Sequence, residues 1–363
     1  MRLVEYSLHT YSLRYERPVK WSDIVEEAAP FVLLRLQDDT GAVGAAEITV
    51  KPTWCGVTAR SLIATIEEVF IPILAAIDLD DPESVRRTLD RIPENQAAKT
   101  LIDNACWDLY SARTGRSLRE RWEGAPTVEL SWALTRQAPR AMAEEAATMI
   151  ARHGFRTLKI KGGQGLAIDQ AVMRKVRAAA GPSVQLYVDA NGAYPLAEAA
   201  DYALAMHDAG AVLVEDPCPL SPDADFRSLQ QNLPVTLLVD FGCASLRDAR
   251  LFIEQGARAI SIKPGRFGIS DSRAMQRLAT DANCTPVVGL MGESLLGTYA
   301  ALQFAAAIPD PALPAELSWY LAMTEQIVTV APKVIQGTLK LPDTVSMAEL
   351  IDWGAVERLR PRG

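Results

Sequence analysis

Short apolar runs of strand length alternate with longer stretches of helical periodicity from residue 127 onward. The runs cover residues 155–161, 184–189, 211–215, 235–240 and 258–263. The helical stretches that follow them cover residues 166–180, 196–207, 225–232, 245–255 and 270–282. This alternation is typical of parallel strands joined by crossover helices.

Further elements flank this series. A run at residues 127–134 precedes it, and a run at 285–290, a helical stretch at 295–307 and a short run at 315–319 follow it. Eight strands in one parallel α/β series predict a closed barrel, of a modified TIM-type (β/α)7β form. An open doubly wound sheet is the structural alternative.

The pattern before residue 125 is different. Apolar alternation predicts strands at residues 2–10, 31–37 and 43–49, and the turn signal Asp-Asp-Thr-Gly at 38–41 joins the last two. Helical periodicity follows at residues 59–75, 82–90 and 97–113. Strands followed by helices indicate an α+β domain over residues 1–124, ahead of a barrel over 125–324. We expect residues 325–363 to return and complete the first domain.

Charged residues stand where the predicted barrel strands end: Lys161, Asp189, Glu215, Asp240 and Lys263. Because the carboxyl ends of barrel strands meet at one mouth, we expect these side chains to converge there. Two like charges about 4 Å apart cost about 4 kcal/mol at an effective dielectric near 20, so three carboxylates favour a bound cation. Oxygen ligands suit Mg²⁺, with Mn²⁺ as the alternative. For any one of the three, a helix N-cap is the structural alternative.

Two lysines flank the predicted metal site, Lys161 on one side and Lys263 on the other. Lysine is a poor base at neutral pH unless burial or neighbouring cations disfavour its charged form. Lys159, two residues earlier on the same face of its strand, and the metal itself are such cations. The pattern therefore allows lysine acid–base chemistry.

These segments resemble the enolase superfamily, in particular its muconate-lactonizing subgroup. The resemblance rests on Lys-Ile-Lys at 159–161, Val-Asp-Ala-Asn at 188–191, Val-Glu-Asp-Pro at 214–217, Val-Asp at 239–240, Ile-Lys-Pro at 262–264 and the glycine-rich segment 289–298 with its glutamate. It implies Asp189, Glu215 and Asp240 as Mg²⁺ ligands, and Lys161 and Lys263 as acid–base groups on opposite faces of a carboxylate substrate. It also implies that the first domain caps the barrel mouth. A Lys or His base with Mg²⁺ is the pattern that general accounts of enolase-superfamily sites describe.

Five further residues are candidates for substrate contact. Asn191 and Glu293 lie near the strand ends, and Trp21, Lys51 and Trp54 lie on predicted loops of the capping domain. Aromatic and cationic side chains on loops suit a lid over a small ligand. The alternatives are a turn role for Asn191, a helix cap for Glu293 and domain packing for the two tryptophans.

Some positions depart from the family pattern. Phe241 follows the third carboxylate where relatives carry glutamate, which in those proteins can pair with the sixth-strand lysine. A second glycine is missing at 266–269, and Pro-Asp-Thr-Val-Ser-Met at 342–347 replaces a glycine-rich close. Phe241 therefore changes the expected surroundings of Lys263, and substrate contacts near residues 342–347 are expected to be unusual.

The small number of histidines limits the types of reaction that the protein can catalyse. The chain has three, His9, His153 and His207, and none follows a predicted barrel strand. This argues against a mandelate-type racemase, a zinc site or a serine triad. Two lysines permit cycloisomerisation, dehydration as in succinylbenzoate synthase, or epimerisation. Segment 289–294 lacks the Asp-x-Asp pair of dipeptide epimerases.

We therefore expect cycloisomerase-like chemistry, with racemisation of an N-acyl amino acid or dehydration as the alternatives. A Schiff-base aldolase using Lys161 or Lys263 and a binding protein that has lost catalysis are the hypotheses from other classes.

Composition narrows the class of partner. The 363 residues carry a net charge of −8 and no basic stripe, which argues against nucleic acid. The most apolar stretch, 69–77, contains a proline and is shorter than the roughly 20 residues of a membrane helix. No secretory signal is visible in residues 1–18, and five scattered cysteines without a CxxC pair indicate a reduced, cytoplasmic protein. We expect a small-molecule carboxylate substrate and a homo-oligomer.

Overall fold

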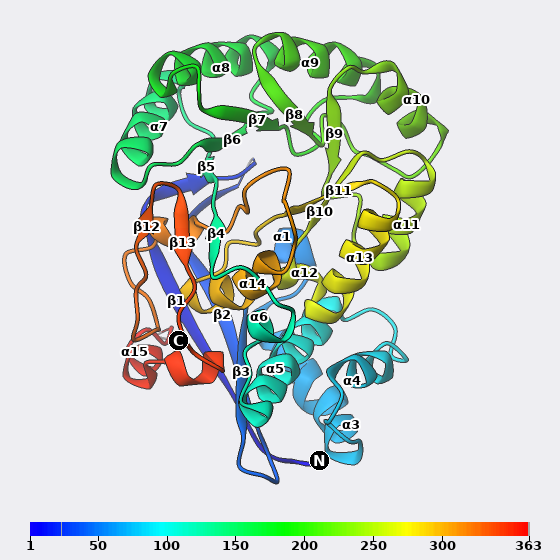
Figure 1. Cartoon of the computed structure of the whole chain (residues 1–363), viewed down its shortest axis with the longest axis vertical. Coiled ribbons are helices and arrows are strands. Elements are labelled where there is room, and N and C mark those ends of the chain that lie inside the picture. The colour runs from blue at the N-terminus through cyan, green and yellow to red at the C-terminus, as the bar shows by residue number, and fades with distance from the viewer. Residues whose placement is uncertain (23, 362–363) are drawn as a thin grey trace.

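The computed structural model describes residues 1–22 and 24–361. A parallel barrel surrounded by helices occupies the upper part of Figure 1, and a β-rich domain with its own helices lies below it. This confirms the predicted fold class. The boundaries predicted at 124/125 and 324/325 stay predictions.

The capping domain is built on an antiparallel sheet in the order β1-β2-β3. Alternate residues of its central strand face different cores: Phe31 and Leu33 pack toward the barrel, and Val32 and Leu34 pack toward the helices of the cap. Period-two alternation with apolar residues on both faces explains why this sheet is buried on both sides. The bounds of its strands are β1 Leu3–Lys20, β2 Val25–Asp38 and β3 Val43–Thr49.

The helices of the cap follow the three strands. Their bounds are α1 Pro52–Cys55, α2 Ala59–Thr65, the π-helical turn Ile66–Phe70, α3 Ile71–Ala76, α4 Pro82–Leu89, α5 Gln96–Thr114 and α6 Leu118–Arg121. Helix α5 carries the longest apolar face and packs directly on β3. The helix predicted at 59–75 is thus present but interrupted by one π turn.

The predicted end of the first strand and the predicted start of the second strand were wrong. The first strand continues to Lys20 and the second begins at Val25, so residues 15–20 belong to a long hairpin and not to a loop. Tyr11, Leu13 and Tyr15 are buried and alternate with the more exposed Ser12 and Arg14, so residues 11–15 carry a strand signal beyond the predicted end at residue 10. The tip of the hairpin then reaches the barrel mouth.

The barrel strands form a seven-stranded parallel sheet in the order β11-β10-β9-β8-β7-β6-β5. Their bounds are β5 Trp132–Leu134, β6 Thr157–Lys161, β7 Gln185–Asp189, β8 Ala211–Glu215, β9 Thr236–Val239, β10 Ala259–Ile262 and β11 Thr285–Val288. The surrounding helices are α7 Pro139–His153, α8 Leu166–Ala180, α9 Leu196–Asp208, α10 Ala224–Asn232, α11 Leu246–Glu254, α12 Pro264–Phe267, α13 Ile269–Asp281 and α14 Leu295–Ala306. Each predicted strand and helix from residue 155 to residue 307 is present within a few residues.

The barrel closes without a regular eighth strand. Ser131 N donates to Ala315 O at 2.9 Å, and Glu316 N donates to Val288 O at 2.9 Å, so residues 315–316 connect the segment just before β5 to the end of β11. The predicted strand at 315–319 is therefore wrong in form, although the segment lies in the predicted place. Prolines at 309–314 limit the backbone donors and conformations available on its approach.

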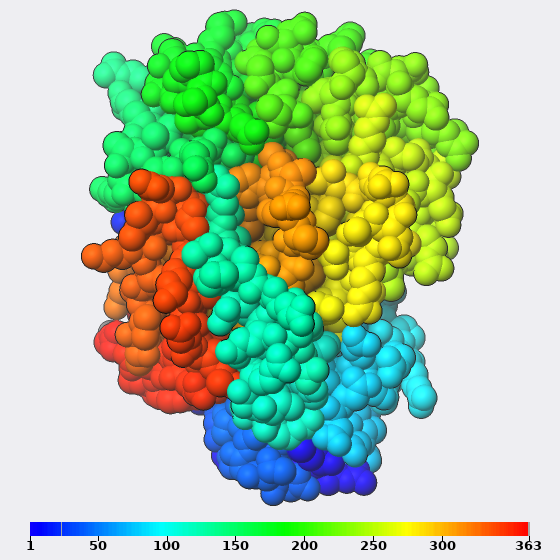
Figure 2. Space-filling view, in the orientation of Figure 1, coloured from blue at the N-terminus to red at the C-terminus, as the bar shows by residue number. Residues whose placement is uncertain are grey.

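The predicted strand at 127–134 is two strands. Strand β4 (Thr127–Glu129) pairs with β13 (Thr338–Lys340) outside the barrel, and β5 enters the barrel after a break. β12 (Val334–Ile335) completes that small sheet. Figure 2 shows this C-terminal part, in red, lying against the teal segment that contains β4.

The chain then returns to the capping domain. The single-turn helices Trp319–Ala322 and Met347–Leu350 and helix α15 (Trp353–Arg358) belong to this part. Asp108 of α5 accepts hydrogen bonds from Met347 N at 2.6 Å and Ser346 Oγ at 2.8 Å. Helix α15 packs on β1.

The described residues contain no helix with both the length and the apolar content needed to cross a lipid bilayer. All five cysteines are free thiols.

Candidate active site at the barrel mouth

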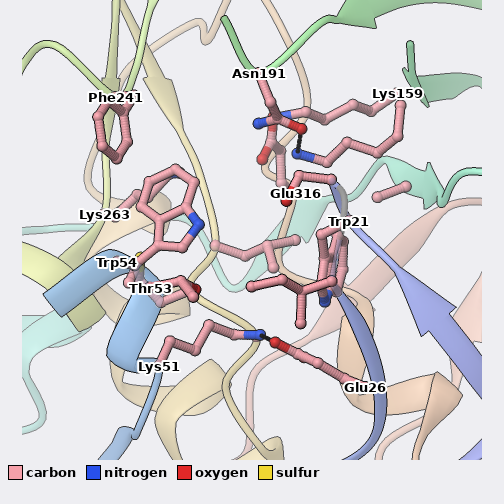
Figure 3. A pocket seen from close by; sticks show the side chains of 17 residues that line it. Trp21, Glu26, Lys51, Thr53, Trp54, Lys159, Asn191, Phe241, Lys263 and Glu316 are labelled. Carbon is pink, nitrogen blue, oxygen red and sulfur yellow. Dashed lines mark hydrogen bonds and ion pairs between the residues drawn. The ribbon is translucent and has the colours of Figure 1, made fainter. Parts of the chain in front are cut away.

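A cavity of about 220 Å³ opens where the barrel strands end beneath the capping domain. Its barrel side includes Lys159, Lys161, Asn191, Lys263 and Glu316. Its cap side includes Trp21, Ile24, Glu26, Lys51 and Trp54. In Figure 3 the tip of the hairpin contributes Trp21, while α1 and the residue before it contribute Trp54 and Lys51.

The three predicted metal ligands are delivered by neighbouring strands. Asp189 ends β7, Glu215 ends β8 and Asp240 follows β9, and each side chain is almost completely buried. Burial and the nearby charge of Asp189 raise the pKa of Glu215 well above its usual value. Asp189 pairs with Glu215 in the β7–β8 register and Asp240 follows the next strand of the sheet, so the three carboxylates stand at adjacent strand ends.

The predicted catalytic lysines are paired with these carboxylates. Lys161 Nζ lies 2.5 Å from Asp189 Oδ2, and Lys263 Nζ lies 2.5 Å from Asp240 Oδ2. Lys159 Nζ lies 2.7 Å from Glu215 Oε2 and 3.1 Å from Asp189 Oδ2. Each lysine is almost completely buried, so removal of one partner of a pair would leave a buried, uncompensated charge.

The ion pairs determine which groups carry charge. Burial favours the neutral form of Asp189, but the ammonium groups of Lys159 and Lys161 outweigh it and hold the pKa of Asp189 well below normal. Burial likewise opposes the charge of Lys159, but Asp189, Glu215 and Glu316 raise its pKa well above normal. Lys159 therefore stays protonated and acts as a fixed positive charge.

The donor set fits a hard divalent cation. Asp240 Oδ1 is buried without a hydrogen-bond donor, and only oxygen atoms are offered by the three carboxylates. The described residues nevertheless form no group of three acidic, histidine or cysteine side chains around one metal position. The Lys161 and Lys263 ammonium groups lie on Oδ2 of Asp189 and Asp240, and Oδ1 of Asp240 is the oxygen of these two pairs that has no donor.

Asn191 lines the cavity, whereas Glu293 is not among its lining residues and lies against Gly265 and Gly297. Asn191 adopts a left-handed backbone with φ of 51°, which asparagine tolerates, and its Oδ1 accepts from Lys161 Nζ at 3.3 Å. Glu293 accepts from Met291 N at 2.8 Å, and its other oxygen is buried without a partner. Burial raises the pKa of Glu293 to about 7.

The cap residues form the walls of the cavity. Trp21 packs on Trp319 with ring centroids 4.3 Å apart, and Trp54 meets Phe241 edge to face at 5.2 Å. Lys51 Nζ binds Glu26 at 2.7 Å. Domain packing and lining of the cavity are therefore both roles of Trp21.

Phe241 changes the surroundings of Lys263 as the sequence indicated. No carboxylate follows Asp240; instead the Lys263 ammonium lies 4.7 Å from the centre of the Trp54 ring, within cation–π range. Arg266 donates to the backbone oxygens of Asp240 and Phe241, each at 3.1 Å.

Sequence reasoning missed two acidic residues of the cavity. Glu316 accepts from Lys159 Nζ at 2.9 Å and from Tyr187 Oη at 2.6 Å. Glu26 neutralises Lys51. Glu316 stands in the segment predicted as the eighth strand, so its place near the mouth was available from the sequence, whereas Glu26 required knowledge that β2 begins before residue 31.

The fold and the site define a capped α/β barrel with ionisable groups gathered at the C-terminal ends of its strands. Residues 7–120 match the family model "Mandelate racemase / muconate lactonizing enzyme, N-terminal domain", and residues 141–345 match "Enolase C-terminal domain-like". The chain therefore belongs to the enolase superfamily and to its muconate lactonizing enzyme-like subgroup, and it is an enzyme of that superfamily.

Similar proteins carry out different reactions. The chain is 26% identical over 333 residues to o-succinylbenzoate synthase of Geobacillus stearothermophilus, covering 90% of this chain and 88% of that protein. It is 28% identical over 368 residues to N-succinylamino acid racemase of Thermus thermophilus, covering 99% of this chain and 97% of that protein. The structure of a muconate lactonizing enzyme from Mucobacterium Smegmatis in complex with muconolactone superposes with a TM-score of 0.94, 28% identity and full coverage of both chains.

Proposed function

We propose that this protein is a Mg²⁺-dependent enzyme that removes the proton next to a substrate carboxylate, through an enediolate, in cycloisomerase-like chemistry. One observation carries the proposal. Lys161 at the end of β6 and Lys263 after β10 line the same cavity, and each contacts one of the buried strand-end carboxylates.

Asp189, Glu215 and Asp240 would hold the metal, as their oxygen-only donor set suggests. Bound Mg²⁺ would supply Lewis-acid stabilisation of negative charge on the substrate carboxylate, a contribution of several kcal/mol. Lys159 stays charged between Asp189, Glu215 and Glu316, so its part is to hold these carboxylates in place and add positive potential.

The two remaining lysines move protons in this proposal. The Lys161 ammonium lies 5.6 Å from the centre of the Trp21 ring, and the Lys263 ammonium lies 4.7 Å from that of Trp54. In Figure 3 these two rings lie on different sides of the cavity. A neutral lysine on one side would take the α-proton, and the protonated lysine on the other side would return a proton to the product.

Racemisation is the second candidate, because lysines on two sides can take a proton from one face and return it to the other. The N-succinylamino acid racemase relative favours this alternative. Dehydration, the third outcome, is represented by the o-succinylbenzoate synthase relative.

Deuterium exchange tests the proposal. Muconolactones and N-acyl amino acids would be incubated in D₂O with Mg²⁺, and incorporation followed by mass spectrometry, with products identified to separate the candidate reactions. We expect Lys161→Met and Lys263→Met each to slow turnover by about 10² to 10⁴-fold, the usual contribution of a general acid or base. Lys340→Met, an exposed lysine on β13, is the matched control. Undiminished exchange in both site variants would refute the lysine mechanism.

A further inference from the structure

We infer that Arg136 is a positioning residue for Lys161, because its guanidinium joins the backbone that follows Lys161 to the backbone that follows Asp189. Arg136 lies between the end of β5 and the start of α7, on the same side of the barrel as the other strand ends. The inference rests on the proposed function for the part that Lys161 plays in proton transfer. It concerns backbone contacts, so it does not depend on how the side chains of Lys161 and Asp189 are paired.

The guanidinium of Arg136 makes hydrogen bonds to two neighbouring strand ends. Its Nε donates to Gly162 O at 2.6 Å, and its Nη2 donates to Ala190 O at 3.3 Å. Gly162 directly follows Lys161, and Ala190 directly follows Asp189. Arg136 is only 5% exposed, and a guanidinium is a planar, rigid fork, so the two carbonyl groups are held at a fixed separation.

These contacts begin where the pairing of β6 with β7 stops. Lys161 lies opposite Asp189 in that pairing, and Gly162 N donates to Asp189 O at 2.8 Å. Beyond this bond both chains leave the sheet, and Arg136 joins them again one residue further on. The last residues of the two strands are therefore held by the sheet on one side and by Arg136 on the other.

Gly163 leaves the space that the guanidinium occupies. Its φ is 79°, in the left-handed region that favours glycine. A Cβ atom at this position would overlap with Arg136 Nη2 and with the Ala190 carbonyl oxygen that Nη2 binds. The turn after Lys161 is therefore built around this arginine.

The backbone of Arg136 holds the cap hairpin at the same place. Arg136 N donates to Lys20 O at 2.8 Å, next to Trp21 at the tip of the hairpin. The Lys161 ammonium lies 5.6 Å from the centre of the Trp21 ring. Arg136 therefore contacts both the backbone beside the proposed proton-transfer group and the hairpin that supplies the cavity wall next to that group.

Loss of the guanidinium should affect the two proton-transfer lysines unequally. Lys161 ends β6, whereas Lys263 follows β10, and β7, β8 and β9 lie between these strands in the sheet. An error of about 1 Å in the position of a reacting group can lower the rate by about 10²-fold. A side-chain substitution at Arg136 keeps its backbone bond to Lys20, so it tests the guanidinium contacts alone.

Exchange of α-protons on opposite faces of a substrate tests the inference. The probes are the two enantiomers of N-succinyl-phenylalanine, and muconolactone, whose two methylene protons next to the carboxylate are distinguished by NMR. Exchange would be measured in D₂O with Mg²⁺, and Lys161→Met and Lys263→Met identify the face that each lysine serves. We expect Arg136→Met to slow exchange on the Lys161 face at least tenfold more than on the Lys263 face. Arg156→Met, which removes an exposed arginine, is the matched control and should change neither rate.

Arg136→Lys separates the geometry of the guanidinium from its charge. Lysine keeps the positive charge but lacks the fork that donates to two carbonyl groups at once, so the imbalance between the two faces should remain. Complete recovery of both rates in Arg136→Lys would overturn the inference. Equal slowing of both faces in Arg136→Met would overturn it as well, because a general loss of structure would then explain the effect.

Hydrogen exchange of the backbone gives a readout that needs no turnover. Residues 161–164 and 189–192 should exchange faster in Arg136→Met than in the wild type, and Arg156→Met should match the wild type. If the wild type exchanges no α-proton of any probe, the proposed function fails. Faster backbone exchange in Arg136→Met would then still support the placement of both segments by Arg136, and unchanged backbone exchange would overturn it.

Discussion

Glu293 is a buried carboxyl group whose hydrogen-bonding capacity is only partly satisfied. One of its oxygens is bound by the backbone of Met291, and the other faces Gly265 without a partner. A side chain at Gly265 would collide with this carboxylate and displace it. Burial raises the pKa of Glu293 to about 7, compared with an ordinary value near 4.5.

This shift makes stability depend on pH. The folded protein keeps the Glu293 proton to higher pH than the unfolded chain, so the free energy of unfolding falls as pH rises from about 4.5 to about 7. The loss amounts to about 3 kcal/mol at 1.36 kcal/mol per pKa unit. Glu293→Gln lacks this loss, so it should gain stability relative to the wild type between pH 5 and pH 8. Urea denaturation in the presence of a chelator, at pH 5 and at pH 8, gives the free energy of unfolding of both proteins. If the difference between variant and wild type is the same at both pH values, the raised pKa of Glu293 is refuted.

Metal binding gives a second prediction at this scale. Mg²⁺ at one hundred times its dissociation constant should stabilise the wild type by about 2.7 kcal/mol, because it binds the folded state alone. Glu215→Gln removes a proposed ligand and should abolish most of this gain in a thermal scan. Glu254→Gln, at the exposed end of α11, should keep it. Equal stabilisation of all three proteins would exclude Glu215 as a ligand.

The strand-end residues were predictable because strand ends converge in a barrel whatever the side chains are. Asp189, Glu215 and Lys263 follow from the spacing of the repeats alone. The lysine–carboxylate pairs and the cap wall were not predictable in this way. The pairs depend on which rotamers fill the mouth, and rotamers leave no periodic signal. The cap wall depends on how far the hairpin extends, which the alternation at residues 11–15 indicates only in part.

Among the elements, α5 forms hydrogen bonds with segments that lie far apart in the sequence. Asp108 accepts from Ala45 N at 2.8 Å, Ser346 Oγ at 2.8 Å, Met347 N at 2.6 Å and Ala348 N at 3.1 Å. Burial raises its pKa to about 6. One carboxylate thus joins β3, α5 and the C-terminal return.

Asp108→Asn should weaken this junction. The amide has only one oxygen to accept these four donors, so some buried N–H groups lose their partner, at about 1 to 3 kcal/mol in total. The free energy of unfolding from urea titration should fall by that amount, and hydrogen exchange should accelerate at residues 346–350. Asp208→Asn, on the exposed end of α9, should change neither measurement. Unchanged exchange at 346–350 would show that other contacts hold the segment.

Regular elements were predicted better than their irregular neighbours. Helix α8 was expected at residues 166–180 and begins and ends there, because its apolar face repeats with helical period between glycines. The β4–β5 break was not expected, and the closing segment at 315–316 was expected as a regular strand. Their pairing partners lie far away in sequence, and only those partners decide where each strand stops.

At the scale of the molecule, one face of the cap sheet packs into the core of the barrel. Tyr11, Phe31 and Leu33 belong to the same apolar cluster as the barrel core, whereas the opposite face of the sheet belongs to the cap. Glu47 at the end of β3 also accepts from Ser294 N at 2.8 Å and Ser294 Oγ at 2.6 Å, next to the start of α14. The two parts are therefore joined through an apolar core and a buried polar contact.

We predict that the protein unfolds in one calorimetric transition. A fragment of residues 1–124 should expose the barrel-facing side of its sheet, bind a hydrophobic dye and self-associate, because that face loses its cover. The full chain at the same concentration is the control and should bind little dye. Two separate transitions, or a monomeric fragment without dye binding, would mean that the cap is an independent folding unit.

The long β1–β2 hairpin has a consequence for how such a protein can change over evolutionary time. Its tip contributes Trp21 and Ile24 to the cavity, whereas Lys159, Lys161 and Lys263 stand on the barrel. Selection can therefore act on one surface turn and alter which molecule is admitted, while the reaction chemistry is inherited unchanged. Homologues that evolve toward a new substrate would therefore differ first in the amino acids at this turn.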